Sequence, residues 1–538
     1  MRSISLKTIF IFLIILLIIY AIYSNYIKNN IRNNEKKESE EITSEKTIST
    51  DLRIGVAEFD NINPILSNNK NVQNISRLIY EPLFNLTEAY KLEPCLAKEW
   101  TRISDRTYLI KLRENVLWQD GKKFDSSDVE FTIDMLKQSG INSVYSYNVD
   151  KIISVEKVDE YTIRLEIENE ELFFEYNLIF PIMSSKYYKN YNEFISESKN
   201  RMPVGTGMFY ISETDEYTIG LKKNTNWWNN SKKEVKLQNI SLNLYNSMNS
   251  MFTDFKNSKL DIFTTSNLNI ENYIGDSGYL RAEYINRNYT YLALNCDNTI
   301  LQDNAVRRAI ALAIDKNELI NKLFDGKYIK SDFPLDFGSY AYKKENDTIE
   351  FNQDKAQDEL VNNGWSYEKN YWRKKENYKQ LKIELKLIVN EENSKQVEIG
   401  EEIAEQLSKI GINVKVKKVV KKEYNKYIDK KNYDIILMDR NYGYSPDISY
   451  YLGDENISNY KSERMNKLLV EFKYLSSNEE IQKNCSEIIK VYNEDCPYVG
   501  LFYDINTLVY SKELKGRVAP TSYNLFYNIN EWYREIEK

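Results

Sequence analysis

Alternating apolar and polar positions dominate the first half of the globular sequence and predict β-strands. The alternation at 108–113 and again at 161–167 predicts two strands, each with one buried face. Between them, Asp120-Gly121 is typical of a turn, and residues 125–126 are suited to begin a helix. The apolar side of that helix is formed by Val129, Ile133 and Leu136. Strands are therefore expected to outnumber long helices from residue 51 to about residue 288.

The apolar pattern changes to a repeating unit of strand and helix between residues 383 and 438. Strands are predicted at 383–389, around 414–416 and at 433–438, with helices at 396–410 and 423–430 between them. This β-α-β-α-β order predicts a mostly parallel sheet. The near-continuous apolar run at 433–438 also predicts a strand that is buried on both faces.

The polar loop after this buried strand is the first candidate ligand site. In open α/β sheets, ligands bind beyond the carboxyl ends of the strands. The loop at 439–447 places two carboxylates, a guanidinium, an amide and two phenols at such an end. The candidate contacts are Asp439, Arg440, Asn441, Tyr442, Tyr444 and Asp447. The alternative is an ordinary solvated loop, but the position after a central strand favours binding.

A long apolar segment precedes the globular part. Lys7 and Lys28 bracket 20 uncharged residues, and a bilayer core is crossed by about 20 apolar residues in a helix. We therefore expect an uncleaved transmembrane helix within 1–27, and a cleaved signal peptide is the competing interpretation. Residues 28–50 are mostly polar or charged and are expected to form a flexible linker.

Composition excludes several classes of protein. The chain of 538 residues is too long for one ordinary domain, and its net charge of -7 argues against a nucleic-acid binder. The sequence contains no histidine, which excludes Ser-His-Asp and Cys-His catalysis and His-ligated zinc. The four cysteines form no Cys-x-x-Cys pair, which argues against a zinc ribbon or a thioredoxin-like site. Neither a metal site nor a cofactor is expected. Cys485 and Cys496 are expected to be separate buried thiols, with a disulfide as the alternative.

Several short motifs occur in a specific order along the chain. The most specific stretch, 108–129, contains a strand, the turn Trp118-Gln-Asp-Gly and a helix start. The further motifs lie before and after this stretch, at 53–64, 79–83, 204–207, 226–228, 303–315 and 407–414. Together these motifs resemble the bacterial extracellular solute-binding proteins of family 5, over a range from about 51 to 515.

The resemblance implies an α/β fold of the two-lobed, periplasmic-binding-protein-like kind (type II, Venus-flytrap) with an additional third lobe. A transmembrane helix is expected to precede this fold. Residues 51–83, 202–288 and 499–538 would form lobe I, 84–201 the extra lobe II, and 289–498 lobe III. The chain would cross between lobes near residues 289 and 498, and a ligand held between two lobes would close them around these crossings.

The resemblance also implies a function and a location. It indicates the substrate-binding component of an ABC importer, which binds peptides and delivers them to permease and ATPase subunits. The globular part would lie on the extracellular or periplasmic side of the cell membrane, as a monomer attached through the N-terminal helix. Neither enzymatic activity nor nucleic-acid binding is expected.

One departure from the family concerns the α-ammonium group of a peptide. Peptide-binding members have an aspartate in the loop after the buried strand, and counting back from Pro446 places Tyr442 there. A phenol with an ordinary pKa of about 10 is uncharged at neutral pH. Asp439 is therefore the first candidate partner of the ammonium, and Asp447 the second. The remaining candidate contacts are Glu58, which matches a ligand-contacting position in oligopeptide binders, Phe59 and Tyr145.

Two other functions stay open at this point. The same fold could bind a non-peptide solute, such as a metal chelate, an opine or a sugar. A tethered receptor that passes peptide signals to a membrane partner is the second alternative. Permease and ATPase genes beside this one would favour the importer.

Overall fold

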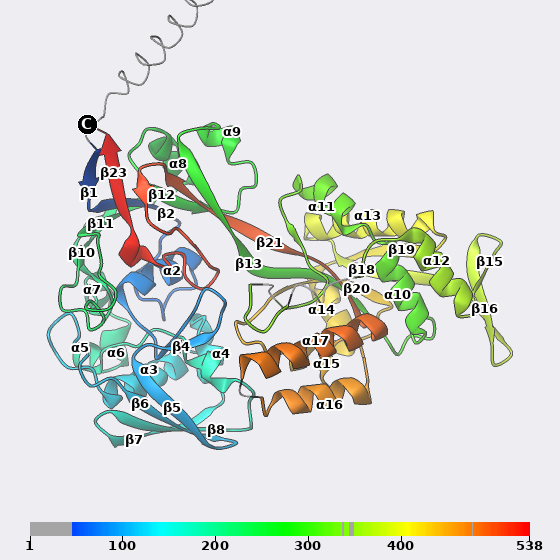
Figure 1. The fold of residues 1–538 in the computed structure, drawn as a ribbon, viewed down its shortest axis with the longest axis horizontal. Helices are drawn as coiled ribbons and strands as arrows, with labels where there is room; N and C mark the ends of the chain where they lie inside the picture. The colour runs from blue at the N-terminus through cyan, green and yellow to red at the C-terminus, as the bar shows by residue number, and fades with distance from the viewer. Residues whose placement is uncertain (1–45, 336–337, 344–348, 476, 538) are drawn as a thin grey trace, which may run out of the picture. The chain divides into compact units, whose positions relative to one another are not determined.

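The computed structural model describes residues 46–335, 338–343, 349–475 and 477–537. The chain divides into two units, residues 1–49 with 535–538 and residues 50–534. The first unit contains β1 (Lys46–Ser49), which the sequence places at the end of the predicted linker. The features below belong to the second unit (Figure 1).

The fold prediction is wrong in one respect, because it included a membrane-spanning helix. No helix in the described part of the chain is both long and apolar enough to cross a bilayer, which takes about 20 apolar residues. The 18-residue helix α17 (Asn478–Asp495), for example, carries charged side chains along its whole length. The predicted span within 1–27 lies outside the described residues. The observed fold class is mixed α/β with several sheets.

A mixed eleven-stranded sheet forms the framework of the unit. In spatial order its strands are β19 (Asn413–Val419), β18 (Glu384–Asn390), β20 (Ile435–Asn441), β13 (Tyr279–Leu294), β21 (Tyr498–Ser511), β12 (Ile262–Thr265), β2 (Asp51–Ala57), β11 (Asn239–Tyr245), β10 (Thr218–Lys223) and β9 (Phe209–Thr214), with β14 (Ile329–Lys330) beside β21. β18 runs parallel to β19 and β20, as the sequence predicts. β2 likewise runs parallel to β11 and β12. The sheet as a whole is not mostly parallel, because β13 and β21 are antiparallel and lie in its middle.

The two long strands β13 and β21 connect the two halves of the large sheet (Figure 1). At about 3.3 Å per residue, the 16 residues of β13 extend over roughly 50 Å. The pairing register shifts between Ile285 and Tyr289, and Arg287, within that interval, has a φ of 68°. An irregularity of this kind bends a strand locally. It lies close to residue 289, where the sequence predicts a crossing between lobes.

The predicted repeating unit is formed by β18, α13 (Ser394–Lys409), β19, α14 (Lys421–Lys430) and β20. α13 begins two residues before the predicted start, because the side chain of Asn393 accepts a hydrogen bond from the backbone N–H of Gln396 (3.3 Å). Just beyond the helix, Gly411 has a φ of 78°, a conformation that favours glycine.

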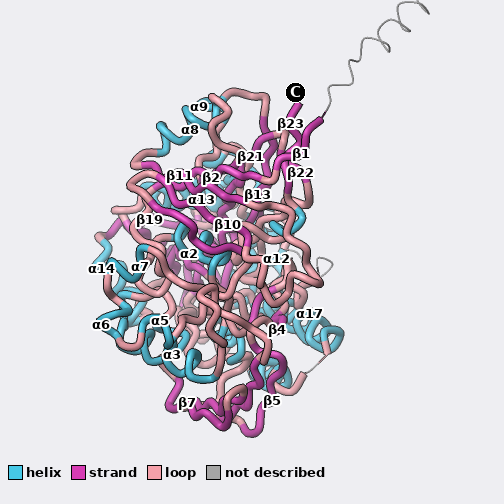
Figure 2. The backbone as a smooth tube through the Cα atoms, turned by 90° about the vertical axis from the view of Figure 1, so that its left-hand side faces the viewer, coloured by secondary structure: helices cyan, strands magenta, loops and turns pink. Residues whose placement is uncertain are grey.

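A separate four-stranded sheet contains β5 (Ala97–Ser104), β6 (Thr107–Leu112), β8 (Thr162–Ile167) and β7 (Ile152–Asp159) in spatial order. It packs near α3 (Ser126–Ser139), which begins with a capping box between Asp125 and Asp128. The buried Trp118 donates from Nε1 to Asp128 Oδ2 (3.0 Å), which gives the Trp-x-Asp-Gly motif a structural role. Figure 2 shows β5 and β7 at one end of the unit and β2 and β11 toward the other.

Shorter elements complete the unit. Further helices are α2 (Lys70–Ile79), α4 (Ser146–Val149), α5 (Ser185–Tyr188), α6 (Tyr191–Phe194), α7 (Glu197–Arg201), α8 (Met248–Lys256), α9 (Glu271–Ile274), α10 (Asn304–Ala313), α11 (Lys316–Phe324), α12 (Gln353–Asn362), α15 (Ser449–Leu452) and α16 (Glu463–Phe472). Further strands are β3 (Phe84–Leu86), β4 (Leu92–Pro94), β15 (Ser366–Glu368), β16 (Tyr371–Glu376), β17 (Lys379–Lys382) and β22 (Leu514–Lys515).

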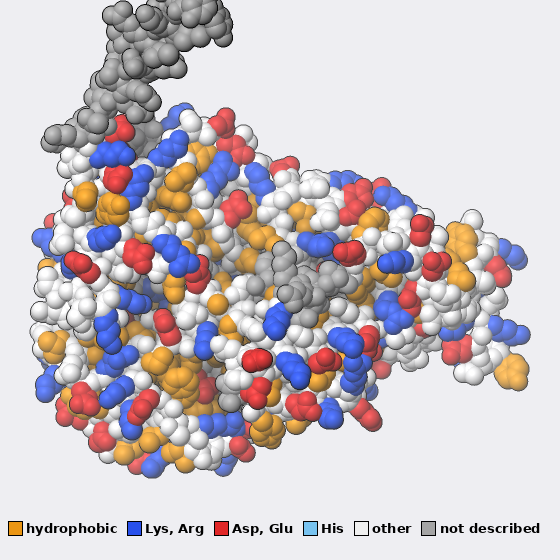
Figure 3. Space-filling model, in the orientation of Figure 1, with side chains coloured by type: hydrophobic (Ala, Val, Ile, Leu, Met, Phe, Trp, Pro, Cys, Tyr) orange, Lys and Arg blue, Asp and Glu red, His pale blue; other side chains and the backbone are white. Residues whose placement is uncertain are grey.

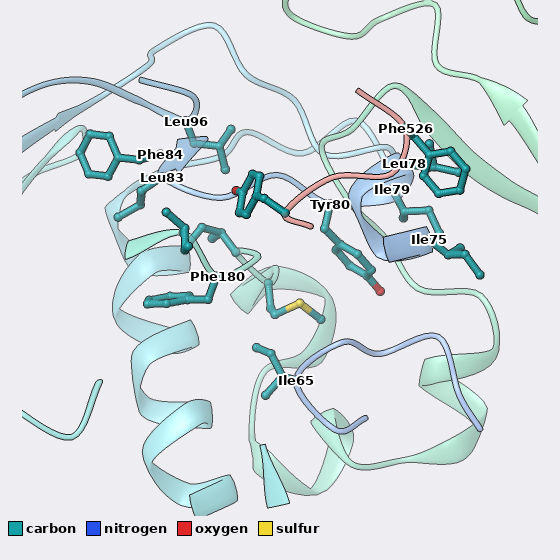
Figure 4. Close-up of a cluster of buried hydrophobic side chains, with 14 of the residues drawn as sticks. Ile65, Ile75, Leu78, Ile79, Tyr80, Leu83, Phe84, Leu96, Phe180 and Phe526 are labelled. Atoms are coloured by element: carbon teal, nitrogen blue, oxygen red, sulfur yellow. The ribbon is translucent and has the colours of Figure 1, made fainter. Parts of the chain in front are cut away.

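Apolar side chains form separate cores on the two sides of the long strands. One core joins α2 and β3 to the C-terminal segment, where Phe526 lies near Leu78 of α2 (Figure 4). Another is built from β18, β20 and the helices α10 to α13. On the surface, acidic and basic side chains are interspersed over the face in Figure 3. That pattern agrees with the modest net charge of -7.

Candidate ligand-binding site

A cavity of about 550 Å³ lies beyond the carboxyl ends of the parallel strands β2 and β12. This is the position at which ligands bind in open α/β sheets. Amide and hydroxyl groups, together with one charged residue of each sign, contribute to its lining. Its polar lining includes Glu58, Lys70, Asn71, Asn74, Thr265 and Asn506. The cavity is large enough for several groups of a polar ligand.

The chain that leaves β2 is held in place by α2. Asn71 donates from Nδ2 to the carbonyl oxygen of Ala57 (2.7 Å), and its own backbone N–H donates to the N-cap side chain of Asn69 (2.8 Å). Glu58 has a φ of 57° and donates from its backbone to Tyr245 (3.1 Å), while its side chain stays exposed. These contacts direct the Glu58 carboxylate to the cavity wall, although the fold itself does not require a carboxylate there.

Asp439 occupies the end of β20 and receives only neutral hydrogen bonds. Its Oδ1 accepts from the hydroxyl of Thr290 (2.9 Å). Its Oδ2 accepts from Gln396 (2.7 Å) and Asn393 (3.3 Å) at the start of α13. No described cation lies within ion-pair distance of this half-buried carboxylate. Its negative charge is therefore oriented but not neutralised by a direct partner.

Asp439 belongs to a charged cluster that also contains Asp504, Lys395 and Lys70. The second carboxylate of this cluster is Asp504 of β21. It accepts one hydrogen bond from Asn288 Nδ2 (3.0 Å). Burial raises the pKa of Asp504, the charge of Asp439 raises it further, and the nearby Lys395 opposes both effects. Two interacting carboxylates of which one has a raised pKa form a suitable place for a ligand cation.

Two lysines complete the charged cluster. Lys395 donates to the hydroxyl of Tyr328 (3.0 Å). Burial acts to lower the pKa of Lys395, but the hydrogen bond with Tyr328 and the charges of Asp504 and Asp439 raise it overall. Lys70, which lines the cavity, has a lowered pKa because surrounding protein displaces water, and Asp504 opposes that shift. Lys70 thus connects the cavity electrostatically with Asp504.

The geometry of β21 also places the cavity and the charged cluster together. Asp504 and Asn506 are two residues apart in a strand, so their side chains point to the same face. Asn506 lines the cavity, and its Oδ1 is buried without a hydrogen-bond partner among the described residues. A buried acceptor without a donor is costly, and a ligand N–H group would remove that cost.

The other predicted contacts from the 439–447 loop mostly pack against aromatic side chains. Tyr442 stacks on Tyr451 with 4.6 Å between ring centroids, and burial raises the pKa of Tyr442 well above its ordinary value. Tyr444 donates to the carbonyl oxygen of Ser522 (2.9 Å). The Arg440 guanidinium lies 3.8 Å from the centroid of the Tyr450 ring. These side chains therefore have structural partners.

The last four predicted contacts lie in different surroundings. Asn441 is exposed at the end of β20. Asp447 accepts from the backbone N–H of Ser449 (2.8 Å), as in a local turn. Phe59 is half-buried against the core, and Tyr145 donates to Gln73 Oε1 (2.6 Å). Ligand contact by any of the nine residues stays a prediction.

Sequence reasoning missed Asp504, Asn506, Lys70 and Lys395. The available signal is the spacing of Asp504 and Asn506 within an otherwise apolar strand, since two polar residues on one strand face need a polar environment. The two lysines carry no comparable signal. A lysine in the first turn of a helix is usually solvated, and only the tertiary structure places these two near carboxylates.

Comparison with known proteins identifies the class of this chain. A family model described as bacterial extracellular solute-binding proteins, family 5 Middle, matches residues 91–459. This chain belongs to the bacterial extracellular solute-binding proteins of family 5.

Named relatives and solved structures cover nearly the whole chain. The oligopeptide-binding protein AppA of Bacillus subtilis is 23% identical over 90% of this chain and 91% of its own. The heme-binding protein A of Haemophilus influenzae is 23% identical over 82% of this chain and 84% of its own. Among solved structures, HbpA2 from Haemophilus parasuis has a TM-score of 0.75 and 19% identity, covering 91% of this chain and 100% of that one. The murein tripeptide-binding protein MppA, in an unliganded open form, has a TM-score of 0.76 and 17% identity, covering 91% of this chain and 99% of that one.

Proposed function

We propose that the protein captures peptides outside the cell and delivers them to the permease and ATPase subunits of an ABC importer. Membership of the family supports solute binding, and the relative AppA is named for oligopeptides. The observation that carries the peptide assignment is the interaction of Asp439 with Asp504, whose pKa is raised. Asp504 lies two residues from Asn506, a cavity residue whose Oδ1 has no hydrogen-bond partner among the described residues. A peptide has an ammonium group for the carboxylates and a backbone for the amides.

The ammonium group of the peptide is assigned to Asp439 and Asp504 together. Asp439 has no ion-pair partner among the described residues, and burial, together with the charge of Asp439, raises the pKa of Asp504. A ligand ammonium between them would stabilise both charges, since opposite charges a few ångströms apart favour each other's ionised forms. The proposal thus adds Asp504 to the candidate that the sequence indicates, Asp439.

Calorimetry with matched peptides tests this assignment. Asp439→Asn and Asp504→Asn are each expected to weaken peptide binding by about 1.5–3 kcal/mol, the usual size of a charge-assisted hydrogen bond. N-acetylation of the peptide should cost the unmutated protein a similar amount. Asp447→Asn is the matched control, because Asp447 serves a local turn, and it should leave the difference between free and acetylated peptides unchanged.

The outcomes separate peptide recognition from its alternatives. Equal binding of free and acetylated peptides would refute the ammonium assignment but leave peptide binding intact. If no peptide bound while a metal chelate, an opine or a sugar did, the peptide proposal itself would fail. A receptor for peptide signals would bind peptides but support no uptake in cells that contain the permease and ATPase.

A further inference from the structure

A second cavity, here called the Trp228 cavity, lies apart from the strand ends of the ligand site. Its volume is about 370 Å³, and it is bounded by the end of α2, by β3 and β4, and by the C-terminal segment. Its charged and aromatic lining includes Arg77, Glu81, Arg113, Trp228, Lys233 and Tyr523. None of the residues that line the first cavity lines this one.

Arg77 brings an uncompensated positive charge to the Trp228 cavity. Its guanidinium carbon lies 3.6 Å from the centroid of the Tyr523 ring. Its Nε is buried and has no hydrogen-bond acceptor among the described residues. Burial acts to lower the pKa of Arg77, but neighbouring tyrosines, Tyr523 first, raise it overall, and no carboxylate is among these influences. A buried cation without an anion is costly, so an anion from outside would stabilise this site.

A second guanidinium reaches the same cavity. Arg113 lies 4.4 Å from the centroid of the Trp228 ring and donates from Nε to the backbone carbonyl of Cys95. No described carboxylate makes an ion pair with it. Lys232 and Lys233 are exposed at the cavity and add further positive charge. Arginine forks match the geometry of carboxylate and phosphate groups.

The carboxylates of the cavity are too few to balance these charges. Glu81 is buried and accepts hydrogen bonds from Trp227 Nε1 (2.9 Å) and Trp228 Nε1 (2.8 Å). Burial raises the pKa of Glu81, although the two indole hydrogen bonds and the charge of Arg113 act to lower it. The half-buried Glu93 is the other acidic residue in the lining. Four basic side chains therefore face two acidic ones, and the indole rings held by Glu81 supply flat apolar walls.

We propose that the Trp228 cavity binds a small organic anion, with its oxyanion group between Arg77 and Arg113 and its flat body against Trp228 and Tyr523. Guanidinium groups stacked on aromatic rings present their N–H edges to such an oxyanion, and the rings present their faces to an apolar body. Carboxylates and phosphates share the required chemistry. The ligand of this cavity is distinct from the solute of the main site, so the inference does not depend on peptide binding.

Benzoate and phenyl phosphate are suitable probes, and neutral benzamide is the control for the flat body alone. Calorimetry should show saturable binding of at least one anion. Benzamide should bind at least about tenfold more weakly than that anion. Arg77→Gln should weaken anion binding about tenfold or more, whereas Arg77→Lys, which keeps the charge but loses the fork, should weaken it less. Comparing the two anions tells whether the cavity accepts a carboxylate or a phosphate.

A matched control variant and a competition experiment make the test specific. Arg164→Gln removes an arginine that pairs with Glu156 on the four-stranded sheet, outside the cavity, and should leave anion binding unchanged. Circular dichroism must show that Arg77→Gln is folded. If it is not, the anion affinity of Arg77→Lys is compared with that of wild type instead. The proposal is overturned if neither anion binds saturably at millimolar concentration, or if Arg77→Gln binds as wild type does. It is also overturned if saturating peptide displaces the anion, because the anion would then occupy the main site.

Discussion

Replacing Asp128 by asparagine should destabilise the protein by about 2–4 kcal/mol. The Asp128 side chain is fully buried, at 0% exposure. Its Oδ2 accepts from Trp118 Nε1 (3.0 Å), Lys186 Nζ (2.9 Å) and the backbone of Asp125 (3.1 Å). Its Oδ1 accepts from the backbone N–H (2.9 Å) and hydroxyl (2.6 Å) of Ser185. Donors therefore surround both oxygens.

The size of the effect follows from these donors. An asparagine amide has one oxygen, so its N–H₂ group must face either Ser185 or the three donors around Oδ2. With the amide nitrogen toward Ser185, the hydroxyl can turn and accept, but the backbone N–H of Ser185 loses its partner. Lys186 also loses one charged partner, although Asp125 Oδ2 stays 2.9 Å away. The retained contact is why we expect less than the full cost of about 3–5 kcal/mol for breaking a buried ion pair.

Urea unfolding followed by tryptophan fluorescence measures this effect, because Trp118 is one of the partners. Asp134→Asn is the matched control: Asp134 is exposed on the same helix, and a surface change should stay within about 0.5 kcal/mol. A loss below about 1 kcal/mol for Asp128→Asn would refute the argument that all these donors need the carboxylate.

Three further predictions concern pH, motion and a close backbone contact. Because Asp504 has a pKa above its usual value of 3.8, affinity for a peptide ammonium should be full above that raised pKa and fall as the pH drops through it. Calorimetry across acidic pH should show a smaller loss of affinity in Asp504→Asn, which keeps only Asp439, than in wild type. Saturating ligand should reduce the radius of gyration measured by small-angle scattering, since closure about β13 and β21 brings both sides of the sheet onto the ligand, and an unchanged radius would contradict closure. Gly205→Ala should destabilise the protein by about 2 kcal/mol or more, because a Cβ there would collide with the backbone carbonyl of Ile79. Gly443→Ala, with no atom within 4 Å of the added Cβ, should have little effect. Equal denaturation midpoints for the two variants would count against this reasoning.

Local periodicity was sufficient to predict the repeating unit between β18 and β20. Each apolar face in that segment belongs to one element, and the elements follow one another closely, so short-range patterns contain the information. The pairing of β13 with β21 joins residues more than 200 positions apart in the chain. No local pattern specifies such a partner, and the antiparallel centre of the sheet was therefore not predicted. The register shift beside Arg287 likewise has no glycine or proline to mark it.

Local sequence patterns are likewise sufficient for one part of the candidate site and not for the rest. Asp439 follows directly after the apolar run at 433–438 and lies near the end of β20, so the rule for strand ends in open sheets indicates it. Tyr442 and Tyr444 of the same loop are also predicted ligand contacts, but their rings pack with tyrosines from other segments. The role of an aromatic residue in a loop depends on such distant neighbours. Asp504 lies within a strand rather than at its end, so the rule did not apply to it.

The placement of Asp504 has a consequence for how binding and motion are related. Asp504 belongs to β21 and Asp439 to β20, and both strands lie beside β13, close to its irregularity at Ile285–Tyr289. Burial and the neighbouring carboxylate raise the pKa of Asp504 and so disfavour its charge. A bound cation would remove that cost only where it lies near both carboxylates. Both strands pair with β13, and pairing holds neighbouring strands about 4.8 Å apart. The two carboxylates are therefore already positioned for a cation, and closure depends on the contacts that the rest of the ligand makes.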